Sequence, residues 1–172
     1  MKRLRVIGIG QTLAGDDGVG MMVARHLRFV CGSEVDIVEA GVPGVGLLDL
    51  LRDVEAAVVI DAVQSGRPPG MLHRLEIPRD LNVLLHAWGR GCSSTHAFGL
   101  GETLMLGQTL GLLPAIMRVY GIEIGQIERG NPLSPPLLAG FHSAARQIQQ
   151  DIEQLVAMLQ DLGKSRQEQT GA

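Results

Sequence analysis

This chain of 172 residues has few aromatic residues, few cysteines and no long run of charge of one sign. Aromatic residues make up 3% of the chain and hydrophobic residues 45%, so aliphatic side chains and methionine must fill the core. This length and apolar content predict one domain. Two cysteines, Cys31 and Cys92, argue against a disulfide framework and indicate a reducing compartment, so we expect a cytoplasmic protein.

Long apolar segments and basic patches are also missing. No segment is long and apolar enough to span a bilayer, and the basic, apolar start leads directly into a glycine-rich turn rather than a signal-peptide core. The formal net charge of −3 argues against nucleic acid or an anionic membrane surface as the main partner. A basic or metal-bearing partner remains open.

Short apolar runs alternate with helical patterns along the chain. We expect strands at 4–8, 35–38, 56–60, 117–124 and, at a sheet edge, 71–77, and helices at 16–30, 45–51, 96 to about 112 and 134 to about 159. Residues 1–162 are therefore predicted to form a single α/β domain: a mostly parallel twisted sheet with helices on both faces, in a three-layer sandwich. Residues 163–172 are predicted to be a polar, disordered tail. Helical periodicity assigns Met22, Met105 and Leu138 to buried faces.

The first candidate site is the glycine-rich turn that follows the first strand, from Gly8 to Gly20. A dinucleotide fingerprint is disfavoured, because Leu13 stands in place of its third glycine and two aspartates occupy the pyrophosphate position at the helix start. Such a turn indicates a cation or a donor group as ligand. Asp16 fits the helix-cap position. Asp17 then lies in the first helical turn, where its carboxylate is freer to face a ligand.

Two further candidates, Asp61 and His96, belong to the same predicted edge of the sheet. Asp61 directly follows a buried apolar run, and ligands of open parallel sheets bind at the carboxyl ends of the strands. His96 opens a helix, where the cationic form of imidazole is disfavoured and a neutral ring is available to a metal. The alternatives are a turn or cap for Asp61 and a structural histidine at His96. Two oxygens and one imidazole suit Zn, Ni, Mn or Fe(II).

Other nucleophiles and histidines are weaker candidates. His86 competes with His96 as a ligand, whereas we find no chemical argument for His26, His73 and His142. A thiol mechanism based on Cys92 and His96 is disfavoured, since no neighbouring residue clearly orients the imidazole.

Five stretches, in order, carry a resemblance to a known family: Gly8–Gly20, Glu39–Gly44, Val59–Val63 with Pro69-Gly70, Ser94–His96 with Gly99-Leu100, and Leu133–Pro135. Together they resemble the hydrogenase maturation endopeptidases over about residues 4–160. The chain departs from that family at Gln11, where Asn is usual, at Asp17, where some members have Glu, and at Ala40 and Val42, which replace Gly and Thr. These departures concern substrate subtype more than reaction class.

The resemblance implies an endopeptidase that removes a C-terminal extension from a hydrogenase large-subunit precursor after nickel has been inserted. Asp17, Asp61 and His96 would be its metal-binding and catalytic residues, and the nickel would be supplied by the precursor rather than permanently bound. Two alternatives stay open: a non-catalytic nickel-binding or assembly module and, less favoured, a nucleotide-binding α/β protein. We expect the three side chains to share a solvent-open crevice, with His86 outside it or at its rim.

Overall fold

The apolar runs form one five-stranded sheet in the computed structural model, which describes residues 4–88, 99–125 and 132–170. Its strands lie in the order β2 (Val35–Gly41), β1 (Leu4–Ile9), β3 (Ala56–Val63), β5 (Ile116–Glu123) and β4 (Leu72–Ile77). The first four are parallel, and β4 pairs antiparallel with β5 at the edge. The predicted mostly parallel sheet, with residues 71–77 as an edge strand, is confirmed.

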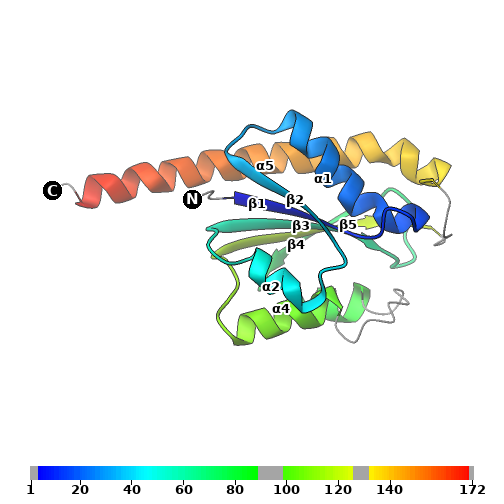
Figure 1. Cartoon of the computed structure of the whole chain (residues 1–172), viewed down its shortest axis with the longest axis horizontal. Coiled ribbons are helices and arrows are strands. Elements are labelled where there is room, and N and C mark those ends of the chain that lie inside the picture. Colours follow the sequence, from blue (N-terminus) through cyan, green and yellow to red (C-terminus); the bar gives the residue numbers. More distant parts are fainter. Residues whose placement is uncertain (1–3, 89–98, 126–131, 171–172) are drawn as a thin grey trace.

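Helices cover both faces of this sheet (Figure 1). On one face lie α1 (Val19–Val30) and α5 (Pro135–Thr170), and on the other lie α2 (Leu47–Leu50) and α4 (Leu100–Thr109). Shorter turns are the 3₁₀ segments η1 (Gly15–Gly18) and η2 (Gly44–Gly46), the helix α3 (Leu81–Val83) and the π-helical turn η3 (Leu84–Trp88). The three-layer α/β architecture therefore agrees with the prediction.

Side-chain alternation along the strands divides the core into two halves. In β3, Val58 and Ile60 pack with α1 and α5, whereas Ala57 and Val59 belong to the half that includes α2 and α4. All four are fully buried. Because successive side chains of a strand point to opposite faces, a central strand covered on both sides is apolar almost throughout.

Three helical residues assigned to buried faces are exposed, so those assignments were wrong. Met22, Met105 and Leu138 have exposed fractions of 37%, 47% and 55%. In α4 the buried face contains Gly101, Leu104 and Gly107, and a side chain one position after Leu104 is turned about 100° away from the sheet. Apolar periodicity thus overestimated the width of the face that each helix buries.

The last helix extends further than its apolar stripe. We expected a polar, disordered tail from residue 163, but α5 continues as a helix to Thr170. Lys, Arg, Gln and Glu are good helix formers and no proline interrupts this stretch, so the backbone stays helical beyond the part that packs on the sheet. Figure 1 shows this end of α5 projecting past the sheet.

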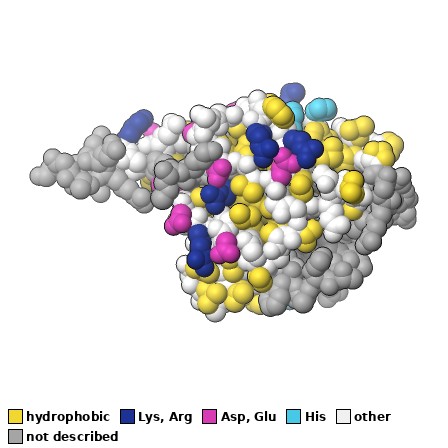
Figure 2. Space-filling model, in the orientation of Figure 1, with side chains coloured by type: hydrophobic (Ala, Val, Ile, Leu, Met, Phe, Trp, Pro, Cys, Tyr) yellow, Lys and Arg dark blue, Asp and Glu magenta, His cyan; other side chains and the backbone are white. Residues whose placement is uncertain are grey.

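Charged side chains of both signs are interspersed on the face shown in Figure 2. In the described part of the chain, exposed basic residues are often paired: Arg25 and Arg28 contact Glu39 at 2.6 and 2.9 Å. No helix among the described residues is both long and apolar enough to cross a membrane.

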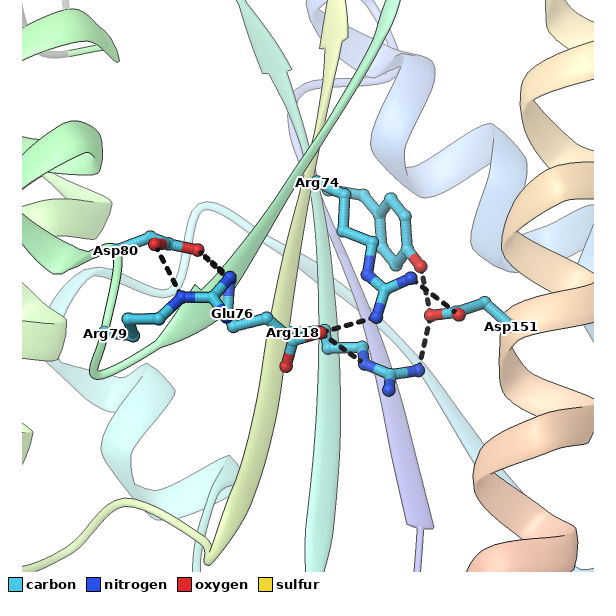
Figure 3. Close-up of polar contacts among 7 residues, drawn as sticks. Arg74, Glu76, Arg79, Asp80, Arg118 and Asp151 are labelled. Carbon is cyan, nitrogen blue, oxygen red and sulfur yellow. Dashed lines mark hydrogen bonds and ion pairs between the residues drawn. The ribbon is translucent and has the colours of Figure 1, made fainter.

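A polar cluster ties α5 to the two strands at the antiparallel edge (Figure 3). Asp151 of α5, only 7% exposed, accepts hydrogen bonds from Arg118 Nη1 at 2.7 Å and from the Tyr120 hydroxyl. Its second oxygen pairs with Arg74 Nη1 of β4 at 3.2 Å, and Arg118 Nε also donates to Glu76 at 3.1 Å. The buried carboxylate is therefore matched by charge, as burial of an ion requires.

Gly20 allows α1 to start directly on the ends of two strands, and this yields a first prediction. A Cβ at this position would lie 2.4 Å from the carbonyl oxygens of both Ile9 and Ile60. We expect Gly20→Ala to lower the free energy of unfolding by at least about 2 kcal/mol, because backbone atoms must shift. Gly46→Ala is the control: its φ is −61° and no heavy atom lies within 4 Å. Urea unfolding of both variants measures the difference, and equal small effects would contradict the close approach.

Candidate active site

The turn η1 places Asp17 at the carboxyl end of β1. The side chain is partly exposed, and its Oδ2 accepts a hydrogen bond from the backbone N–H of Gln11 at 3.2 Å. The α-helix proper begins only at Val19, and its N-cap residue Gly18 makes no side-chain cap. Asp17 is thus not the cap of α1, and its carboxylate closes the glycine-rich turn instead.

Asp61 lies two residues before the end of β3, not directly after the strand as we expected. The pairing of β3 with β1 stops at Ile60, so Asp61 is the first residue of β3 without a partner in β1. Its Oδ1 accepts a hydrogen bond from the Ala62 N–H at 2.8 Å. By strand alternation the side chain points to the face that carries α2 and α4.

The close approach at Gly20 explains why Asp17 and Asp61 influence each other. Gly20 contacts Ile60, the residue before Asp61, and lies three positions after Asp17. Desolvation raises the pKa of the Asp61 carboxyl to about 7; the Ala62 N–H opposes this, and the negative charge of Asp17 adds to it. At neutral pH this carboxyl therefore holds its proton far more than an ordinary aspartate does, and a nearby cation would favour its ionised form.

The third predicted residue, His96, lies outside the described residues, as does Cys92. Among the residues that are described, no three or more His, Cys, Asp or Glu side chains form a group able to hold a metal ion. His86 is exposed in the turn η3. A crevice shared by Asp17, Asp61 and His96 therefore stays a prediction.

Asp16 does not act as the helix cap that we predicted. Its side chain is 2% exposed, and its two oxygens accept hydrogen bonds from the backbone N–H and the hydroxyl of Ser134, at 2.6 and 2.8 Å. Ser134 directly precedes Pro135, the first residue of α5, as the sequence indicated. The carboxylate thus joins the starts of two helices that lie far apart in the sequence.

Sequence reasoning missed Glu123, the last residue of β5. This carboxylate is fully buried and accepts hydrogen bonds from the N–H groups of Ser65, Gly66 and Arg67 at 2.7–3.0 Å and from the Ser65 hydroxyl at 2.7 Å. His73 Nε2 lies 3.0 Å from its Oε2, so a histidine for which we saw no role belongs to this cluster. The available signal was an acid in an apolar strand, together with a turn-rich loop.

The Glu123 cluster holds the loop that follows the strand of Asp61. Burial alone would raise the pKa of Glu123, but the hydrogen bonds from Ser65, His73 and backbone N–H groups outweigh it and leave that pKa below its ordinary value. The backbone carbonyl of Glu123 also accepts from Gly70 N at 2.8 Å, and Gln64 Nε2 donates to Gly125 O at 2.6 Å. The loop 64–70 is therefore anchored at both of its ends.

Comparison with known proteins finds one matching family model and several similar sequences and structures. A family model described as hydrogenase maturation protease matches residues 21–164, a range that includes Asp61 and His96 but starts after Asp17. The hydrogenase expression/formation protein HupD of Thiocapsa roseopersicina is 33% identical over 138 residues, which is 77% of this chain and 59% of HupD. The chain thus spans less than two thirds of that relative.

Two further comparisons extend over nearly the whole chain. The Hydrogenase 2 maturation protease of Escherichia coli is 26% identical over 164 residues, covering 94% of this chain and 93% of that protein. The solved structure of the hydrogenase maturating endopeptidase HybD from E. coli has a TM-score of 0.72 and 23% identity, with 94% of each chain covered. The structural likeness concerns the fold.

The raised pKa of Asp61 predicts how stability depends on pH. The folded protein holds this proton up to about pH 7, whereas an unfolded chain releases it near the ordinary aspartate pKa of 3.8, so stability falls as pH rises between these values. We expect Asp61→Asn to remove this loss and to be more stable than the parent by about 2–4 kcal/mol at pH 8, but not at pH 4. Chemical denaturation at both pH values measures it. Asp49→Asn, at a side chain 76% exposed, is the control, and a pH-independent gain at Asp61 would contradict the shift.

The Glu123 cluster gives a prediction about the loop. Glu123→Gln keeps the shape but replaces one acceptor oxygen by a donor that faces N–H groups. We expect a loss of about 2–4 kcal/mol in the free energy of unfolding and faster amide exchange at Ser65, Gly66 and Arg67. Hydrogen exchange by NMR reads out these amides, and unchanged protection there would show that the carboxylate does not order the loop.

Proposed function

Because this chain belongs to the hydrogenase maturation protease family, we propose that it is an endopeptidase that removes a C-terminal extension from a nickel-loaded hydrogenase large-subunit precursor. The match of the family model over residues 21–164 supports the reaction class. The similarity to the Hydrogenase 2 maturation protease along almost the whole of both chains supports it further. A cytoplasmic place of action stays a prediction.

The observation that carries the metal-recognition part of this proposal is the pair of carboxylates at the ends of β1 and β3. Asp17 is partly exposed on a turn, and Asp61 is so desolvated that its ionised form is disfavoured without a neighbouring positive charge. A cation carried in by the precursor would offset the repulsion between the two. We assign the role of third ligand to His96, which leaves coordination positions for groups of the precursor.

The same pair suits peptide hydrolysis. A metal ion of the precursor can polarise a peptide carbonyl, and a carboxylate beside it can take the proton of the attacking water. Because a neighbouring cation favours the ionised form of Asp61, this carboxylate would be unprotonated beside the metal and able to accept that proton. Cys31 has no part in this proposal, since burial raises the pKa of its thiol to about 11 and leaves it un-ionised.

Cleavage of a purified precursor tests this function. We expect the protein to trim nickel-loaded precursor and to leave nickel-free precursor intact, as mass spectrometry of the C-terminus would show. Asp17→Asn should reduce cleavage by more than about 100-fold with little change in stability, because Asn can still accept the Gln11 N–H while the charge is lost. Cys31→Ala and Cys92→Ala should retain cleavage.

The rival functions give different results in the same assay. Tight binding of the loaded precursor without trimming would identify a non-catalytic nickel-binding or assembly module. Loss of cleavage in Cys92→Ala, with folding intact, would point to a thiol mechanism. We also expect the isolated protein to lose nickel on dialysis against a chelator, because its own ligands leave the coordination sphere open.

A further inference from the structure

We propose that Asp16 is a positioning residue, whose buried carboxylate fastens η1 to the start of α5 and thereby holds Asp17 in the orientation that recognition requires. The inference rests on the proposed function, since it deepens the role assigned to Asp17. Its structural part, the control of Asp17 by the contact between Asp16 and Ser134, is testable without any substrate.

Asp16 and Asp17 are consecutive residues of one four-residue 3₁₀ turn, so their backbones move together. The Asp16 carboxylate has two short, charge-assisted hydrogen bonds to Ser134, at 2.6 and 2.8 Å. Among the described residues, the Asp17 carboxylate has one longer bond, 3.2 Å from Gln11 N. The orientation of Asp17 therefore depends on the turn, and the turn is fastened through its neighbour.

In the glycine-rich turn around these residues, the backbone segments pack closely against each other. A Cβ on Gly10 would lie 2.0 Å from the Asp17 carbonyl oxygen, and one on Gly18 would lie 3.0 Å from the Gln11 carbonyl oxygen. A displacement of Asp16 would thus be transmitted to Asp17 rather than absorbed locally.

The alternative is that Asp16 merely stabilises the packing of α5. A second contact of the same kind tests this alternative. The Tyr120 hydroxyl donates to the buried carboxylate of Asp151 in α5, as the Ser134 hydroxyl, just before α5, donates to Asp16. This bond belongs to the polar cluster around Asp151, which Figure 3 shows, and both of its residues lie more than 100 positions after η1 in the sequence. Ser134→Ala and Tyr120→Phe each remove one hydroxyl that donates to a buried carboxylate, so they separate positioning from stability.

Two measurements on these variants test the inference. The first is the ¹H–¹⁵N signal of Gln11 and its exchange rate, because this N–H is bound by the Asp17 carboxylate. The second is kcat/KM for cleavage of nickel-loaded precursor. We expect Ser134→Ala to shift the Gln11 signal and to lower kcat/KM about 10- to 100-fold. Tyr120→Phe should leave both at the parental values, and Ser134→Thr should restore both.

Each outcome decides a specific point. An unchanged Gln11 signal in Ser134→Ala, or equal losses of activity in Ser134→Ala and Tyr120→Phe, would overturn the positioning role. A shifted Gln11 signal in a protein whose parent form cleaves no precursor would support the positioning of Asp17 and refute the proposed function. If Ser134→Ala does not fold, Asp16→Asn, which keeps the size and one acceptor oxygen, is measured in its place with the same expectations.

Discussion

The contact of Gly20 with the carbonyl oxygens of Ile9 and Ile60 is the constraint on which the candidate site depends. Because glycine has no side chain, the first helix can start directly on the ends of β1 and β3. The turn that precedes this helix then carries Asp17 to the sheet edge where Asp61 follows Ile60. A larger residue at position 20 would push the helix away from the strand ends and separate the two carboxylates. The position of both site residues therefore depends on this backbone contact.

Three buried carboxylates fix how elements of the fold pack together, whereas Asp61 has a different environment. Asp16, Glu123 and Asp151 are all less than 8% exposed, and each accepts hydrogen bonds from another element of the chain. A buried ion satisfied in this way specifies which elements pack together. Asp61 differs: in the described part of the chain its carboxylate accepts one hydrogen bond, from the adjacent Ala62 N–H, and the charge of Asp17 acts on it. A strongly shifted pKa at a residue near the carboxyl end of a strand is typical of functional sites.

Two consecutive acids of one turn have different environments: the first is buried and hydrogen-bonded, and the second is partly exposed to solvent. Asp16 is bound at the start of α5, while Asp17, on the same turn, is partly exposed. Across the edge, Glu123 fastens the loop that follows the strand of Asp61. Under the proposed function, this arrangement would orient the Asp17 and Asp61 carboxylates before the precursor binds.

The sequence by itself determined the mostly parallel sheet, its edge strand, the helices on both faces and the turn that carries Asp17, because strand and helix periodicity and glycine turns are local signals. It could not determine the partner of Asp16, since Ser134 is 118 residues away, nor the cluster formed by Glu123, His73 and residues 65–67. It also misjudged Met22, Met105 and Leu138, because a periodic stripe does not state how much of a helix its neighbours cover. Which polar groups meet, and which apolar ones stay in water, was decided only when distant segments packed together, since burial and hydrogen bonding depend on contacts between them.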